Sequence, residues 1–431
     1  MCQSYFQLLD IYRKNQFSTL LCSCCLLLAT NVSALNLVQA EQLAVKDDPS
    51  IESFRATSRS YGEESVADDT LPDPRLVLGA VNVPIDTFDL EQEPMTQLKI
   101  GVVQAFPRGN TLQLKQQQSQ SLSRSASAMA DNARLKTISD VRETYLNLYY
   151  EVSAYQVINE TRLLFSELAK ITESSYAAGR VNQQDVLLAD LELSRLDDRA
   201  TKIQASEEGY RAKLAQWIGD IAWTAISTEF PELPDIPENV DLNQVIPRHP
   251  LIRAESAKVE ASQKMTEMAR QEYKPGWSAS LDYGHRSGNN PDGTERADFA
   301  SALVSLDIPL FTGNRQDKTV AANEEKIASA RYAKDDKLRT LKQQYEQNQH
   351  LWQRLSERKR LYETRLLTSA KNNARAALNA YQSGISEFNT LMRAQITELD
   401  VRLENLRIQV DRAIAQTKIL YVIGDSKNET L

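Results

Sequence analysis

The chain has 431 residues and a formal net charge of −8, with charged side chains on 25% of its positions. This acidic balance argues against a nucleic-acid partner, which would need a basic surface. Glycine and proline occur only 14 times each, and 42% of the residues are hydrophobic, so the composition favours a mainly helical protein.

The first 34 residues have the pattern of a secretory signal peptide. Arg13 and Lys14 precede an apolar core at 17–29, and residues 32–34 supply a small-x-small cleavage site. All four cysteines lie in this segment, so the mature chain would have no disulfide, thiolate metal site or cysteine nucleophile. No run of 18 or more apolar residues follows it, which excludes a membrane-spanning helix. We expect an exported protein.

The rest of the chain contains an internal repeat. The motif Tyr-x-x-Gly at 176–179 recurs 205 residues later at 381–384, inside a second long stretch without proline. Two further pairs of landmarks keep nearly the same spacing, namely 107–110 with 311–314 at an offset of 204 and 217–220 with 422–425 at 205. Three landmarks in register indicate a duplication whose copies differ by one inserted or deleted residue.

The first repeat is expected to span residues 35–223. Its beginning, 35–48, predicts an amphipathic helix that Pro49 ends. Two strands are expected at 75–84 and 97–106, the second with alternating faces.

A helical hairpin is expected at 108–223, because no proline follows Arg108 until residue 231. Apolar residues at a 3–4 spacing between 138 and 155 predict a coiled-coil seam in its first helix. Gly179 would end that helix in the left-handed region. Asn182 would cap the returning helix, with Asp185 near position N3.

A connector with five prolines is expected at 224–250, and the second repeat at 251–431. The second repeat predicts strands at 276–285 and 298–309, in which apolar and polar residues alternate strictly in the first. A second helical hairpin is expected at 311–425.

The strands favour a membrane barrel shared between chains. Each is about 10 residues long, enough to cross a bilayer when tilted, and has one apolar face. Four strands cannot close a barrel, and an open sheet edge in lipid leaves backbone groups unpaired. Three copies would supply twelve strands.

These features resemble the TolC-like outer-membrane efflux proteins. The resemblance covers nearly the whole mature chain and rests on the repeat, the two hairpin tips and the strand pairs. It implies a homotrimer with a twelve-stranded β-barrel in the outer membrane of a Gram-negative bacterium and a long α-helical barrel in the periplasm. It also implies a passive duct without enzymatic activity or cofactor, working with a periplasmic adaptor (membrane fusion) protein and an inner-membrane RND pump or ABC exporter. Residues 71–74, 82–84 and 92–97 look most like the branch that accompanies heavy-metal RND exporters.

The resemblance places adaptor docking at the two periplasmic tips. The expected docking residues surround the two tip glycines: Tyr176, Gly179, Arg180, Asn182 and Asp185 at the first tip, and Tyr381, Gly384, Ser386, Glu387 and Asn389 at the second. Thr390 and Arg393 stand where the family places gate carboxylates, and a ring of Arg393 side chains would disfavour cations.

Simpler interpretations remain open. On the simplest interpretation, the glycines serve only to end helices and the tyrosines only to pack the hairpins, while Asp185 interacts with a helix dipole for about 0.3–1 kcal/mol. The three histidines have no spacing suited to a metal, and no catalytic motif is present. Two other functions also fit the pattern: an outer-membrane duct for type I protein secretion, and a soluble periplasmic coiled-coil scaffold.

Overall fold

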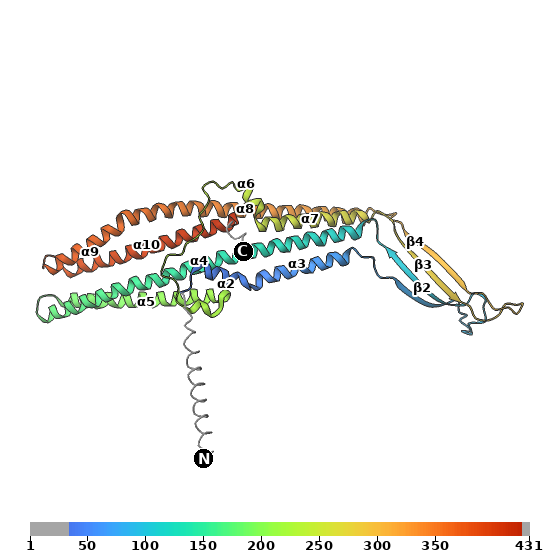
Figure 1. Cartoon of the computed structure of the whole chain (residues 1–431), viewed down its shortest axis with the longest axis horizontal. Coiled ribbons are helices and arrows are strands. Elements are labelled where there is room, and N and C mark those ends of the chain that lie inside the picture. The colour runs from blue at the N-terminus through green and yellow to red at the C-terminus, as the bar shows by residue number, and fades with distance from the viewer. Residues whose placement is uncertain (1–33, 425–431) are drawn as a thin grey trace, which may run out of the picture.

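The structure is a computed structural model that describes residues 34–424, and it is long and narrow, with helices along most of its length and a sheet at one end (Figure 1). The predicted signal peptide lies outside the described residues except for Ala34, as does Asp425 at the end of the second repeat's last landmark. The elements follow in the order α2 (Leu37–Lys46), α3 (Pro49–Asp68), β1 (Arg75–Val81), β2 (Gln97–Phe106), α4 (Thr111–Ala177), α5 (Gln183–Ile218), the 3₁₀ turn η1 (Gly219–Trp223), α6 (Leu242–Arg248), α7 (Pro250–Gln271), β3 (Gly276–His285), β4 (Phe299–Asp307), α8 (Gln316–Leu361), the π-helical turn η2 (Tyr362–Leu366), α9 (Leu367–Gln382) and α10 (Phe388–Ile423).

The predicted order of elements is present in both halves of the described chain. A helix, two strands and a long helical hairpin follow one another as α3 to α5 and again as α7 to α10. The predicted bounds of β2 and β3 are confirmed. That the two halves arose by duplication stays a prediction.

The prediction for the region around Pro49 was incomplete. Pro49 does not simply follow α2, but is the first residue of α3, a helix of 20 residues that the sequence analysis missed. Proline suits a first helical position because no intrahelical partner is lost there. Asp48 caps α3, since its Oδ1 accepts a hydrogen bond from the Ser50 backbone N–H at 2.7 Å. Its Oδ2 accepts another from Thr137 Oγ1 of α4 at 2.6 Å.

Two strands are shorter than predicted. β1 stops at Val81 instead of residue 84, because Asn82 has a φ of 57° and Pro84 has no N–H for a ladder. β4 covers 299–307 instead of 298–309, where Pro309 has the same effect.

The N-terminal helices are fixed to the long hairpins in the middle of the molecule. Leu35 forms a parallel bridge with Ile226, and its carbonyl oxygen accepts a hydrogen bond from Tyr145 Oη at 2.7 Å. Burial raises the pKa of Tyr145 to about 12. Buried Arg142 of α4 and half-buried Glu41 of α2 form an ion pair at 2.7 Å. These contacts join the start of the described chain to its main core.

A second hydrophobic cluster fills the half of the hairpins near the tips. It joins all four helices that reach this end, with Ile158 and Phe165 from α4, Leu196 from α5 and Leu391 from α10 among its buried members. Residues of α9, including Leu378, pack against it. The two tips are therefore held together by a shared core.

The π-helical turn explains why the two repeats differ by one residue. The buried residues of α8 are Gln316, Asn323, Leu341, Tyr345, Asn348 and Leu355. At an offset of 204, five of their six counterparts in α4 are buried, namely Ser119, Thr137, Val141, Thr144 and Glu151, whereas none is buried at an offset of 205. Beyond η2 the offset is 205, where Ala370 answers the buried Phe165. The extra residue therefore lies between 355 and 370, and η2 accommodates it there, because a π turn contains one more residue than an α turn.

The four strands form one antiparallel sheet in the order β1-β2-β3-β4. Leu78, Ile100 and Tyr283 align across β1, β2 and β3 on one face, and Gly79, Lys99 and Gly284 align on the other. Among the described residues, β1 and β4 each have one edge that pairs with no other strand.

Candidate functional site at the hairpin tips and the sheet

Both tips end their first helix with the same backbone motif. At the first tip, Gly179 N–H donates to Tyr176 O at 2.8 Å and Arg180 N–H donates to Ser175 O at 2.9 Å. At the second, Gly384 N–H donates to Tyr381 O at 3.0 Å and Ile385 N–H to Ala380 O at 2.9 Å.

This pair of bonds is the Schellman motif, which needs a left-handed residue at the turn. Gly179 and Gly384 both have a φ of 71°, and a Cβ at either position would meet nothing within 4 Å. The prediction that these glycines end the helices is confirmed, and the reason is backbone conformation instead of lack of space.

The two tips face each other across one cleft. It has a volume of about 840 Å³ and is lined by residues from both hairpins. Nine of the ten predicted docking residues line it: Gly179, Arg180, Asn182, Asp185, Tyr381, Gly384, Ser386, Glu387 and Asn389. The structure thus brings together two sequence segments about 205 residues apart, although their docking role is untested.

Three predicted residues lie outside the lining of the cleft, and a fourth, Asn182, lacks a capping hydrogen bond. Tyr176 is not part of the cleft lining and remains 46% exposed. Thr390 and Arg393 are also outside the lining, on the exposed side of α10. Asn182 occupies the N-cap position of α5 as predicted, but its side chain makes no capping hydrogen bond.

The aromatic residues of the second tip pack against each other. The Tyr381 ring lies against Phe388, with centroids 5.5 Å apart, and Phe388 is buried in the tip cluster. Asp185 lies in the first turn of α5, as predicted for a charge near a helix N-terminus. Neither Asp185 nor Glu387 forms an ion pair with another residue between 34 and 424. The lining of the cleft therefore contains two unpaired carboxylates.

Several residues of the cleft were not predicted from the sequence. Ile171, Ser175 and Gln184 line it together with Val181 and Gln382. Ile171 and Ser175 precede Gly179 by eight and four residues, so helical spacing places them on the same side as the glycine. This spacing was the available signal.

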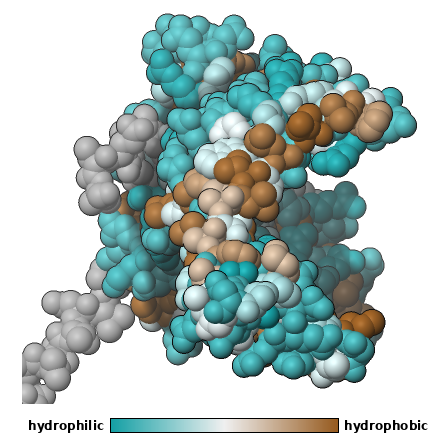
Figure 2. Space-filling model, turned by 90° about the vertical axis from the view of Figure 1, so that its right-hand side faces the viewer, coloured by the Kyte–Doolittle hydropathy of each residue, from teal (hydrophilic) through white to brown (hydrophobic). Residues whose placement is uncertain are grey.

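One face of the sheet carries a row of large apolar side chains that are exposed. Leu78 is 69% exposed and Leu281 is 67% exposed, whereas Asp282 on the opposite face is 8% exposed. Other large hydrophobic residues of the same face are also exposed: Leu76, Leu98, Ile100, Val102, Trp277, Tyr283, Val304 and Leu306. Figure 2 shows hydrophobic residues running in a band across the end of the molecule. Such a contiguous surface indicates a partner or a membrane.

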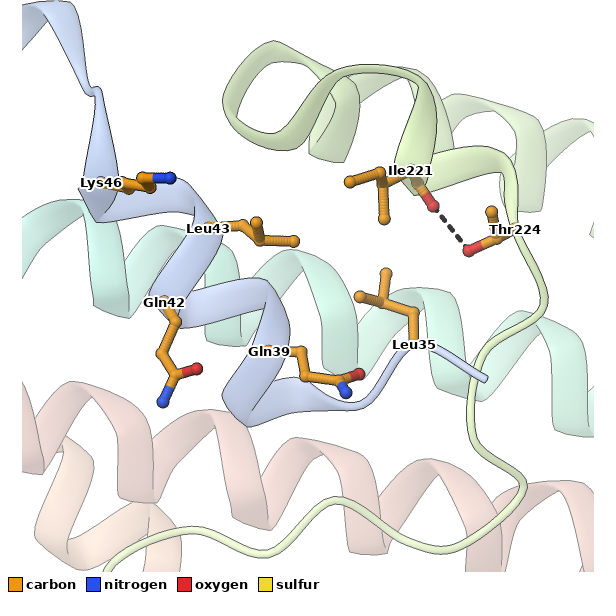
Figure 3. A pocket seen from close by; sticks show the side chains of 7 residues that line it. All are labelled: Leu35, Gln39, Gln42, Leu43, Lys46, Ile221 and Thr224. Carbon is orange, nitrogen blue, oxygen red and sulfur yellow. Dashed lines mark hydrogen bonds between the residues drawn. The ribbon is translucent and has the colours of Figure 1, made fainter. Parts of the chain in front are cut away.

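A further cleft of about 560 Å³ lies in the middle of the molecule, between α2 and η1 (Figure 3). Leu35, Leu43 and Ile221 supply its apolar wall, while Lys46 is its one charged residue. The side-chain hydroxyl of Thr224 donates to Ile221 O at 2.8 Å. This lining contains no acid, histidine or nucleophile paired for catalysis.

Residues 34–424 contain neither a membrane-spanning helix nor a cluster of metal-binding side chains. None of the helices between residues 34 and 424 is both long and apolar enough to span a membrane. Within the same range, histidine, cysteine, aspartate and glutamate nowhere gather in a group of three that could hold a metal ion.

Comparison with known proteins supplies the context for this arrangement. The family model described as "Outer membrane efflux protein" matches residues 242–425. No curated protein matches the chain in sequence.

Several solved structures share its fold. The outer-membrane channel OprN superimposes with a TM-score of 0.76 at 18% identity, covering 90% of this chain and 89% of that one. The CmeC outer membrane channel of Campylobacter jejuni gives 0.77 at 16% identity, with coverages of 90% and 85%. CusC, whose structures concern folding and transmembrane channel formation, gives 0.75 at 13% identity, with 91% and 95%.

The fold and the matched segment agree with one another. Both long hairpins and the sheet are included in the structural coverage of about nine-tenths of the chain, and the matched segment contains the second hairpin and β3 and β4. Residues 242–425 therefore match the outer-membrane efflux family in sequence, and the described chain has the fold of outer-membrane channels over about nine-tenths of its length.

Proposed function

We propose that this protein is the outer-membrane duct of a tripartite efflux system. Small solutes delivered by an inner-membrane pump, through a periplasmic adaptor, leave the cell along a water-filled path inside the assembled protein. The duct performs no chemistry and needs no cofactor. The observation that carries the proposal is the sheet, whose large apolar side chains are exposed while Asp282 on the other face is covered.

The sheet edges support a homotrimer. β1 and β4 are both unpaired along one side within a single chain, and unpaired backbone groups in lipid cost several kcal/mol each. Pairing of β1 in one copy with β4 in the next satisfies both edges. Three copies then give twelve strands with the apolar face towards lipid and the polar face towards water.

The cleft between the tips supports adaptor docking. It lies at the end of the molecule opposite the sheet, on hairpins whose length places it far from the membrane (Figure 1). Its lining offers amides, hydroxyls and both signs of charge, as a protein partner with polar loops would require.

Substitution of the tip glycines tests the docking role. Gly179→Leu and Gly384→Leu place a side chain in the cleft, and we expect export to be lost while the assembled protein remains in the outer membrane. Gly219→Leu is the matched control, because Gly219 also has a positive φ, of 61°, and open space around it, but it ends α5 away from the tips. Normal export by both tip variants would contradict docking at this cleft.

The substrate class is proposed as small solutes. Only the sequence resemblance to the heavy-metal branch supports metal cations as the substrate. The structural likeness to CusC is no stronger than the likenesses to OprN and CmeC. Exposed Arg393 on α10, close to the tip, favours a path that does not concentrate cations. Type I protein secretion is the alternative for the same fold.

The molar mass of the detergent-extracted protein, corrected for bound detergent, separates the proposal from a soluble scaffold. A mass of three mature chains in the outer-membrane fraction is expected. A monomer in the soluble periplasmic fraction would refute the duct and favour the coiled-coil scaffold.

A further inference from the structure

One ion pair lies in the polar face of the sheet. Lys99 Nζ of β2 is 3.1 Å from Asp282 Oδ2 of β3, and the two side chains are 33% and 8% exposed. Ser280 Oγ also donates towards Asp282 Oδ2, at 3.4 Å. Since the opposite face carries the exposed leucines, this pair lies on the side that faces water in the proposed duct.

Glycines shape the surface beneath the pair. Gly101 is the direct cross-strand partner of Asp282, and a Cβ at Gly101 would overlap Asp282 Oδ1 and lie 2.8 Å from its Cγ. The carboxylate therefore lies flat on β2 in space that only glycine leaves free. Gly79 and Gly284 are the cross-strand partners of Lys99 on its two sides, so neither partner has a side chain of its own beside the lysine.

Gln97 repeats the arrangement at the neighbouring position. A Cβ at Gly284 would overlap Gln97 Oε1 and lie 2.9 Å from its Cδ, so the amide lies flat on β3. Asp282 and Gln97 thus each lie along the sheet over a glycine of the neighbouring strand.

We infer that Lys99 and Asp282 determine the charge preference of the sheet end of the duct, and that Gly101 positions their pair against the wall. This inference rests on the proposed function. Each copy presents a cation and an anion that neutralise each other at one depth, so this part of the wall passes anions and cations alike. Removal of either partner leaves an uncompensated charge in every copy, and rings of fixed charge select ions of the opposite sign.

Electrical recording of the full-length mature protein in planar lipid bilayers tests the inference. The permeability ratio of K⁺ to Cl⁻ is obtained from the reversal potential under a KCl gradient. Lys99→Gln should raise this ratio and Asp282→Asn should lower it, each by about two-fold or more, because exposed charges act within a Debye length of roughly 10 Å. The double variant should return to the wild-type ratio, and Lys99→Arg should leave it unchanged.

Gly101→Ala and Gly79→Ala test the positioning role. Both replace a strand glycine, but a Cβ at Gly79 meets nothing within 4 Å. Gly101→Ala should push the Asp282 carboxylate away from β2 towards the water and raise the ratio of K⁺ to Cl⁻, and Asp282→Asn added to it should abolish that rise. Gly79→Ala should preserve the full effect of Asp282→Asn.

The outcomes separate the inference from the function on which it rests. Channels whose permeability ratio is the same in wild type, Lys99→Gln and Asp282→Asn would overturn the inference and leave the duct intact. Failure of the wild-type protein to form any channel would instead refute the proposed duct.

Discussion

Deletion of one residue distinguishes the π-helical turn from the rest of the hairpins. Removing Thr364 from η2 should convert the turn to regular α-helix without changing the orientation of either flank, because η2 contains the one extra residue. The exposed side chain loses only its hydrogen bond to Arg360 O, at 2.7 Å. We expect a cost of about 1 kcal/mol or less in the free energy of unfolding.

Asn159 is the matched deletion in the first hairpin. It is exposed, lies in regular helix and stands 205 residues before Thr364. Its removal would turn the tip half of α4 by about 100°. Phe165 and Leu168, at 1% and 4% exposure, would then leave the tip cluster. Two such side chains at about 1.5–3 kcal/mol each give a loss of about 3–6 kcal/mol.

The thermal midpoint of helix loss, followed by circular dichroism in detergent, compares the two deletions, and limited proteolysis of the tip gives an independent readout. The deletion of Thr364 should unfold close to wild type, and that of Asn159 well below it. Equal midpoints for the two deletions would show that η2 does not accommodate an insertion, and the burial match at offsets 204 and 205 would then be coincidental.

Three further changes test the packing. Burial lowers the pKa of His249, whose Nδ1 accepts a hydrogen bond from Leu251 N–H. As the pH falls, the unfolded chain therefore binds a proton at this histidine before the folded chain does, and the thermal midpoint should fall below about pH 6.5. His249→Gln should weaken that dependence on pH. Arg142→Met leaves the largely covered Glu41 carboxylate without its ion pair and should cost about 3–5 kcal/mol in urea unfolding, whereas a near-neutral result would mean that Glu41 finds water. Gly101→Ala should lower the thermal midpoint by the equivalent of roughly 1–3 kcal/mol of overpacking.

Much of the fold could be predicted because its signals are local and periodic. Strict alternation fixed β3 at 276–285, and the absence of proline marked the long helices. The residues of α3 carry no such signal, because this helix has only two buried positions, Ile51 and Ser65. Its stability comes from packing along α4 and from the cap at Asp48, and neither contact can be read from residues 49–68 alone.

The site divides in the same way. The glycine motif predicted both tips, since a left-handed turn restricts the residue type strongly. That the tips share one cleft depends on the packing of Phe388, Leu391 and Phe165 across two hairpins, which no single segment encodes. The pairing of Lys99 with Asp282 could not be predicted either, because the register between β2 and β3 pairs residues 171 to 187 positions apart in the sequence.

Charged residues lie at both ends of the proposed path. At the sheet, Lys99 and Asp282 compensate each other within 3.1 Å. Near the tip, Arg393 is exposed and forms no ion pair with any residue from 34 to 424. If both sites border the same water, Arg393 repels a cation near the tip while the unpaired carboxylates of Asp185 and Glu387 attract it, and the Lys99–Asp282 pair at the sheet does neither. On the proposed function, any preference for one sign of charge would then arise at the tips, where a partner protein can cover these groups.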